Sequence, residues 1–161
     1  MELGMFLDAV DELEAISKNV SSESPEVLAM WVSVYHGLEK WKAMQAVAIK
    51  LAKIDPENVQ WPISWAFATR RSESIEAAKE ILLDALDRHP MEALVYYNLA
   101  CYDCQLGEVT SSKELLDRAL EISPGFLLMA LEDPDLEPFR PELLEKKKTD
   151  SQASDPTMPG S

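Results

Sequence analysis

The 161-residue sequence predicts an all-α fold made of antiparallel helix pairs that repeat every 34 residues. Three prolines, Pro56, Pro90 and Pro124, lie 34 residues apart, and each follows an amphipathic stretch. Because proline cannot continue a helix and restricts the residue before it, each of them indicates a helix end. The chain also has only 5 glycines and no valine- and isoleucine-rich alternation typical of strands, so helix is the pattern that fits nearly everywhere.

Between these prolines, each repeat reads as two helices joined by a short turn. The first repeat begins at Ser24-Pro25, where an N-cap residue precedes a proline at the first helical position. Ser111 with Glu114 fits a capping box at the start of a later helix. The expected helices are 25–38 and 41–54 in repeat 25–58, 60–71 and 74–88 in repeat 59–92, and 92–106 and 110–121 in repeat 93–126.

The repeats share small and large apolar residues at fixed positions. The third repeat carries Tyr96, Leu99, Ala100, Ser112, Leu116, Ala119 and Pro124. The second carries Trp65, Ala66, Ala78, Leu82, Ala85 and Pro90, and the first carries Trp31, Tyr35, Met44, Ala48, Leu51 and Pro56. With its 34-residue period, this pattern resembles the tetratricopeptide repeat (TPR) family, although Asp103 and Thr69 replace a usual tyrosine. The resemblance implies three repeats in a TPR-like α-solenoid, a right-handed superhelical array of antiparallel helix pairs.

The two ends of the chain differ from the repeats. Residues 1–20 contain an amphipathic, acidic stretch that predicts an N-terminal capping helix. Residues 127–145 predict a C-terminal capping segment, and a short helix expected at 126–132 is cut by Asp133-Pro134. Residues 146–161 have three lysines followed by small and polar residues, so we expect a disordered tail there.

The formal net charge of −14 disfavours two classes of partner. Nucleic-acid binding relies on Lys and Arg that neutralise phosphates, and an acidic protein is repelled by anionic membrane surfaces for the same reason. No run of 18 apolar residues predicts a membrane helix, and the first ten residues lack the basic region of a signal peptide. We therefore expect a cytoplasmic protein that binds neither nucleic acid nor membrane.

Residues that could carry out chemistry are few. His36 and His89 have no partner at metal-ligand or catalytic spacing. Cys101 and Cys104 have C-x-x-C spacing, but a redox motif expects a βαβ context, and a zinc site needs two further ligands that the sequence does not supply. The plain interpretation, two small apolar residues on one helix face, has more weight. We expect no enzyme activity, no cofactor and no metal.

In proteins that resemble this family, ligands lie in a concave groove lined by the first helix of each repeat. The matching positions offer an aromatic and apolar surface with a positive spot, suited to a peptide or helix with apolar anchors and one carboxylate. Alternatively, the apolar residues among them pack against a neighbouring element such as the C-terminal segment. The expected groove residues are Ile63, Phe67, Arg70, Arg71, Leu94, Tyr97, Asn98 and Cys101.

One binding mode of the family is disfavoured. The clamp that grips the C-terminal carboxylate of heat-shock chaperones needs lysine, asparagine and arginine side chains at five positions. Four of these five groups lack the required donor here; the matching residues are Ala29, Ser33, Ser64, Leu94 and Asn98.

The sequence thus predicts a non-catalytic protein–protein interaction module that binds a peptide or helix of a partner protein in the concave groove of three TPR-like repeats. The alternative is an acidic TPR chaperone for a secreted or assembly-prone client protein. Self-association into a homodimer is a further expectation, with capping helices or grooves pairing two copies.

Overall fold

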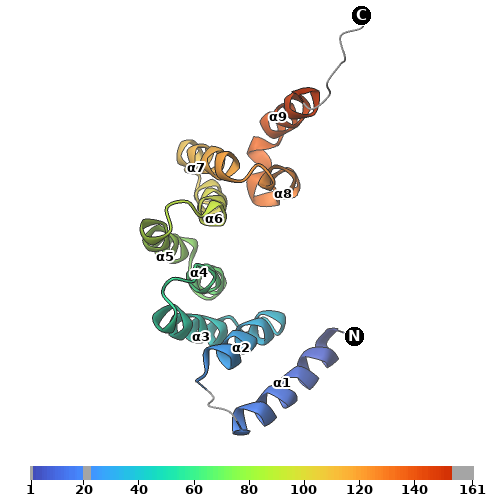
Figure 1. The fold of residues 1–161 in the computed structure, drawn as a ribbon. Coiled ribbons are helices and arrows are strands. Elements are labelled where there is room, and N and C mark those ends of the chain that lie inside the picture. Colours follow the sequence, from blue (N-terminus) through green and yellow to red (C-terminus); the bar gives the residue numbers. More distant parts are fainter. Residues whose placement is uncertain (1, 20–22, 154–161) are drawn as a thin grey trace, which may run out of the picture. The chain divides into compact units, whose positions relative to one another are not determined.

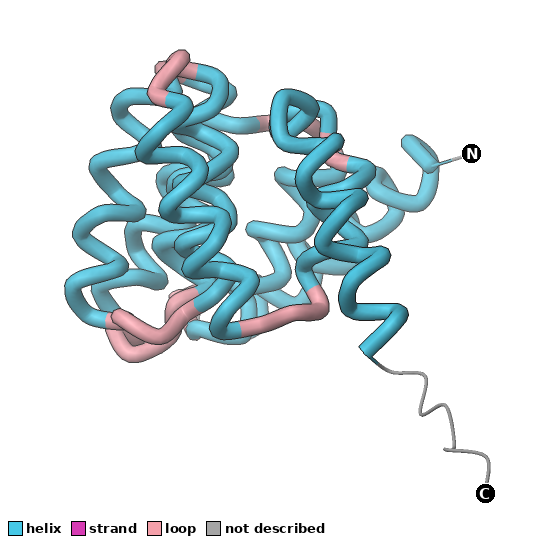
Figure 2. Tube along the Cα trace, turned by 90° about the horizontal axis from the view of Figure 1, so that it is seen from above, coloured by secondary structure: helices cyan, strands magenta, loops and turns pink. Residues whose placement is uncertain are grey.

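The computed structural model describes residues 2–19 and 23–153, and the regular elements of this part of the chain are helices (Figure 1). Two compact units are present, Met1–Pro90 and Met91–Ser161. Short loops connect successive helices (Figure 2). The first unit contains α1 (Glu2–Asn19), α2 (Pro25–Gly37), α3 (Trp41–Ile54), α4 (Gln60–Ser72) and α5 (Ile75–Arg88). The second contains α6 (Ala93–Gln105), α7 (Val109–Ile122), α8 (Phe126–Glu132), the 3-10 helix η1 (Pro134–Phe139) and α9 (Arg140–Ala153).

The helix ends recur at the period that the prolines predict. The residues after α3, α5 and α7 are Asp55, His89 and Ser123, and the backbone N–H of each donates to a carbonyl four residues earlier. Proline follows each of these three residues, so it stops each second helix at the same place in the repeat. At the other end, the Ser24 side chain accepts a hydrogen bond from the Val27 N–H at 3.3 Å, which confirms the predicted N-cap.

In the first unit, small residues let neighbouring helices approach closely and leucines fill the remaining space. Ala48, Ala66 and Ala78 have no exposed surface, and neither do Leu51 and Leu82. Burying each leucine contributes about 1.5–3 kcal/mol relative to leaving it exposed. One cluster of buried residues joins α2, α3 and α4; it contains Leu28, Val32, Met44, Leu51 and Ala68.

In the second unit, α6 and α7 form a hairpin whose core includes two polar side chains. Ser112 donates a hydrogen bond to the Ala100 carbonyl oxygen at 2.6 Å, and the buried Asp103 accepts one from Ser111. The predicted capping box at Ser111 is therefore wrong: α7 begins at Val109, and its N-cap Glu108 makes no side-chain hydrogen bond. The Ser111 hydroxyl instead donates to the Asp103 carboxylate, which is buried and therefore needs a hydrogen-bond donor.

The C-terminal part of the chain is more helical than the sequence predicts. The short helix α8 ends at Glu132, as expected, but α9 continues to Ala153. Residues 146–153 are thus helical rather than disordered, while 154–161 lie outside the described residues. Two features support the helix: Leu143 is buried, and Glu142 forms an ion pair with Lys113 of α7 at 2.8 Å. Lysine is also a good helix former, so the three lysines do not end it.

The capping helix predicted for residues 1–20 is α1, which the structure describes from Glu2 to Asn19. It packs against α2 in the first unit, and Leu13 is its buried residue among those whose side chains are described. Among the helices of residues 2–19 and 23–153, none combines the length and apolar content that crossing a bilayer requires.

Candidate ligand-binding surfaces

The first unit has a pocket of about 810 Å³, which we call the α1–α4 pocket. It lies between α1, the turn that joins α2 to α3, and α4. This volume is within the range of small-molecule and cofactor sites, which is about 300–1,000 Å³. Its lining residues are Met5, Ala9, His36, Gly37, Glu39, Trp41, Phe67 and Arg71.

Three aromatic rings on three different helices meet at this pocket. The His36 ring lies 5.1 Å from the Phe67 ring and 5.8 Å from the Trp41 ring, between centroids. Trp41 and Phe67 are 5.8 Å apart at an interplanar angle of 67°, the edge-to-face geometry that aromatic pairs favour. The rings thus join α2, α3 and α4 at one point and form an apolar wall.

Arg71 adds a positive charge to this wall. It lies one helical turn after Phe67 on α4, and its guanidinium carbon is 3.6 Å from the Phe67 ring centroid and 5.1 Å from that of Trp41. A cation over an aromatic face at an exposed site is stabilised by roughly 0.5–1 kcal/mol. The rings therefore hold the Arg71 side chain along the pocket, where its charge can meet a carboxylate of a ligand.

The turn between α2 and α3 brings His36 and Trp41 together. Glu39 has a φ of 55°, and among the described residues it alone has positive φ without being glycine. The Glu39 N–H donates to the His36 carbonyl oxygen at 3.1 Å, and the Lys40 N–H donates to that of Tyr35 at 2.9 Å. A left-handed glutamate costs about 1–2 kcal/mol. Glu39 is the left-handed C′ residue of a Schellman motif that ends α2, and this accounts for its positive φ.

Of the four groove residues predicted on α4, two line the α1–α4 pocket and two do not. Phe67 and Arg71 line the α1–α4 pocket, whereas the lining does not include the half-buried Ile63 and Arg70. Trp41 also lines the pocket, although it is not among the groove residues expected from the repeat positions. Sequence reasoning also missed Glu39 and the two α1 residues, because the repeat pattern of first helices does not include a turn or a capping helix.

The four residues predicted on α6 lie in a different environment. Tyr97 and Cys101 are only 3% and 4% exposed, while Leu94 and Asn98 are half-buried. The Phe126 ring of α8 stacks on Tyr97, with centroids 5.2 Å apart and planes at 23°. This face of α6 is thus covered by the chain's own C-terminal segment, which was the alternative interpretation of the sequence for Tyr97.

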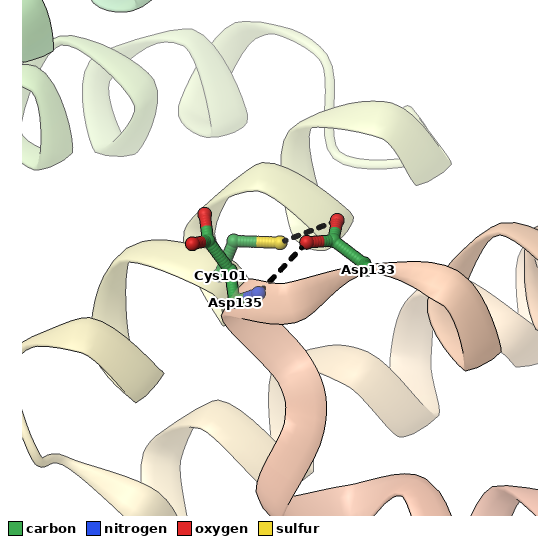
Figure 3. Close-up of side chains that lie close together, drawn as sticks. All are labelled: Cys101, Asp133 and Asp135. Atoms are coloured by element: carbon green, nitrogen blue, oxygen red, sulfur yellow. Dashed lines mark hydrogen bonds between the residues drawn. The ribbon is translucent and has the colours of Figure 1, made fainter.

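Asp133 makes polar contacts between the C-terminal segment and α6. Its Oδ2 atom accepts a hydrogen bond from the Tyr97 hydroxyl at 2.8 Å. The same atom accepts one from the Cys101 thiol at 3.7 Å (Figure 3). Its Oδ1 atom accepts from the Asp135 N–H at 2.9 Å, which caps η1. One turn further along α6, the Gln105 amide donates to the Asp135 carbonyl oxygen at 3.4 Å. Burial, followed by the hydrogen bond to Asp133, raises the pKa of Tyr97, so its phenol stays a protonated donor.

The same place brings together three groups that can bind metals. The ligand atoms of Cys101, Asp133 and Asp135 lie within 4.8 Å of one another. However, the Cys101 thiol and the Asp133 carboxylate are already engaged in the hydrogen bonds of the cover. Neither Cys101 nor Cys104, the other cysteine of the C-x-x-C motif, forms a disulfide, and burial raises the pKa of the Cys104 thiol. A raised pKa lowers the thiolate fraction and therefore the reactivity that redox chemistry needs.

No family model matches this chain. No curated protein matches it either. Solved structures do match. The "Crystal structure of MamA" covers 92% of this chain and 92% of its own, with 18% identity and a TM-score of 0.71. The "Crystal structure of MamA protein" covers 97% and 90%, with 18% identity and a TM-score of 0.70. The structure "First TPR of Spaghetti (RPAP3) bound to HSP90 peptide SRMEEVD" covers 84% and 98%, with 18% identity and a TM-score of 0.60.

These likenesses, at low sequence identity, concern the fold. They confirm the resemblance that the 34-residue period indicated: the chain has an all-α, TPR-like fold.

Proposed function

We propose that this chain is a non-catalytic protein-interaction module that binds a peptide or helix of a partner protein at the α1–α4 pocket. The observation that carries the proposal is the pocket itself, with an aromatic wall and the guanidinium of Arg71 along it. Aromatic residues and arginine dominate the energetics of protein interfaces. The wall supplies apolar area for an anchor side chain, and Arg71 supplies a charge that fixes its orientation.

A structural neighbour supports this class of function. The first TPR of Spaghetti (RPAP3) has a similar fold and was solved bound to an HSP90 peptide. The present chain lacks most of the donors of the chaperone clamp, since Ala29, Ser33 and Leu94 occupy clamp positions. Its partner is therefore expected to use an internal anchor rather than a C-terminal carboxylate.

The charge of the chain supports a protein partner over other classes. With a net charge of −14, affinity for phosphate backbones and anionic lipids is low. We further propose a cytoplasmic location, in keeping with that partner class. No enzymatic step is proposed, because the described residues of the lining offer apolar contacts, the cation Arg71 and the anion Glu39, but no nucleophile with an adjacent base.

The test is affinity capture from native lysate with a Phe67→Ala/Arg71→Glu variant beside the wild type. The matched control is Leu83→Ala/Arg88→Glu, which makes the same kinds of change on α5, at exposed positions outside the lining. A partner held by the wild type and the control, but lost from the pocket variant, supports the proposal. Equal recovery on all three would contradict it, provided that circular dichroism shows equal helicity.

A second candidate is a chaperone for an assembly-prone client. The observation that favours it is the exposed apolar surface on α1, where Met5 is 72% and Leu7 is 54% exposed. Methionine adapts to varied apolar partners. A client that is soluble only when co-expressed with this chain would favour the chaperone; a partner that is stable alone would favour the adaptor. Light scattering tests the homodimer, and a monomer at high concentration would exclude it.

A further inference from the structure

The 34-residue period pairs the pocket residues of α4 with the covered residues of α6. Phe67 corresponds to Cys101, and Arg71 corresponds to Gln105. In the second unit, both corresponding residues contact the chain's own C-terminal segment, Cys101 through the Asp133 carboxylate and Gln105 through the Asp135 carbonyl oxygen. In the first unit, the same two positions line a pocket. The second unit therefore shows what kind of segment covers these positions in this chain.

The covering segment has a simple chemistry. The segment is the 3-10 helix η1, which contains two prolines. Asp133 precedes it and accepts a hydrogen bond from Tyr97 of α6, and Leu136 within it has no exposed surface. Apolar contact with α6 comes from Phe126 of α8, which precedes this segment and stacks on Tyr97. A carboxylate and a nearby apolar anchor are thus the two contacts that the inner face of a repeat makes here.

The residues that differ between the two repeats indicate how a ligand of the α1–α4 pocket differs from the C-terminal segment that contacts α6. Where the second unit has a neutral amide, Gln105, the first has the cation Arg71, which matches a full negative charge better than a carbonyl oxygen. Where the second unit has a small thiol, Cys101, the first has the ring of Phe67 packed with Trp41, which offers more apolar area. The carboxylate contact does not carry over at matching positions, because Ile63 and Phe67 stand where Tyr97 and Cys101 donate to Asp133. In the first unit the donor for a carboxylate is Arg71, one turn after Phe67 on α4.

The remaining charged groups of the pocket set the direction of the occupant. Glu39 lies on the lining at the α2–α3 turn, and His36 lies beside the rings. A carboxylate near Glu39 would be repelled, so we expect the acidic residue of the occupant beside Arg71 and not beside Glu39. The part of the occupant near Glu39 has to be neutral or a hydrogen-bond donor.

We propose that the partner segment bound by the α1–α4 pocket is an acidic, internal turn, with a carboxylate on Arg71 and an apolar side chain against Trp41 and Phe67. This inference rests on the proposed function, because it specifies the ligand of the same pocket. It names a partner that resembles the chain's own 131–139 segment in chemistry, and it requires no free C-terminus.

The experiment uses the full-length chain and three labelled peptides in fluorescence anisotropy. The first peptide is the chain's own 131–139 sequence with blocked ends, the second has its four acidic residues replaced by amides, and the third has them replaced by lysines. We expect the acidic peptide to bind at least tenfold more tightly than the amide peptide, and the lysine peptide to bind more weakly than either. Arg71→Gln should remove most of this preference, while the control Arg88→Gln should keep it.

A second variant protects the test from effects on folding. Met5 is exposed and lines the pocket, so Met5→Glu adds a carboxylate without disturbing the core. It should weaken the acidic peptide at least tenfold and strengthen the lysine peptide. No change in either peptide on Met5→Glu would overturn the inference.

Two other outcomes separate this inference from the proposed function. If the acidic and amide peptides bind equally and both are lost on Phe67→Ala, the pocket binds apolar segments, so the acidic specificity is wrong and the proposed function stands. If no peptide binds, while lysate capture still depends on Phe67 and Arg71, the inference is again overturned alone. If neither peptide binding nor lysate capture changes when Phe67 and Arg71 are replaced, both the acidic specificity and the proposed function are overturned.

Discussion

The Tyr97 hydroxyl donates a hydrogen bond to Asp133 Oδ2 at 2.8 Å, and this bond ties α6 to the start of η1. The other oxygen of the same carboxylate accepts from the Asp135 N–H, so Asp133 both caps the 3-10 helix and holds it on α6. Together with the stacking of Phe126 on Tyr97, this contact keeps the inner face of α6 covered. The corresponding surface of α4 lines a pocket instead, and that difference is the basis of the proposed binding site.

The first prediction concerns this hydrogen bond. Tyr97→Phe should lower the free energy of unfolding of the second unit by about 1.5–3 kcal/mol, the usual worth of a hydrogen bond to a charged group. Asp133→Ala should cost more, because it also removes the cap of η1. Urea unfolding of both single variants and the double variant gives the coupling energy. A coupling near zero would mean that the contact does not hold the segment.

The second prediction is a loss of stability at alkaline pH. The pKa of Tyr97 is raised by burial and by Asp133, so the folded chain keeps this phenol protonated while the unfolded chain ionises it near the ordinary value of 10. The stabilising contribution is therefore complete below pH 10 and is lost progressively as the pH rises above it. Urea midpoints measured from pH 8 to 11 should fall less steeply for Tyr97→Phe than for the wild type. Parallel profiles would contradict the assignment.

The third prediction tests the apolar core of the first unit. Leu51 has no exposed surface and belongs to the cluster that joins α2, α3 and α4. Leu51→Ala should lower the free energy of unfolding by about 3 kcal/mol, the sum of lost burial and a residual cavity. Leu83→Ala, at an exposed position on α5, should change it by no more than about 0.5 kcal/mol. Thermal unfolding monitored by circular dichroism distinguishes the two results.

The fourth prediction concerns the link between α3 and α4. Hydrogen bonds from Gln45 and Lys42, followed by the charge of Lys42, lower the pKa of Glu73 from its ordinary 4.5. Its stabilising contribution is therefore present above pH 4.5 and is lost as the pH falls through the lowered value. Gln45→Ala should raise the pKa of Glu73 toward 4.5 in an NMR titration of the side-chain carboxyl. An unchanged titration curve would show that Gln45 does not contact it in solution.

The repeat architecture was predictable because its signals are local. Pro56, Pro90 and Pro124 end each second helix by the geometry of proline itself, and Ser24 caps α2 through its own backbone neighbours. Such effects act over four or five residues and can be read directly from the sequence. The TPR-like fold follows once the same signals recur at a fixed period.

The binding surface was predictable only in part, because it depends on contacts between distant segments. Phe67 and Arg71 were expected from their repeat positions, but Trp41 joins them only through the turn at Glu39. Likewise, the cover on Tyr97 comes from Asp133, 36 residues later in the chain. No local pattern indicates which apolar positions stay open and which are filled by the chain's own end.

The most direct test of the proposed binding site is site-specific photo-crosslinking from its rim. A photoreactive residue placed at Met5, which is exposed and lines the pocket, is compared with one placed at Leu128, which is 61% exposed on α8. We predict that the captured partner forms an adduct with the Met5 probe but not with the Leu128 probe, and that Arg71→Glu abolishes this adduct. An adduct that forms at Leu128 alone, or that survives Arg71→Glu at Met5, would contradict the claim that the α1–α4 pocket binds the partner.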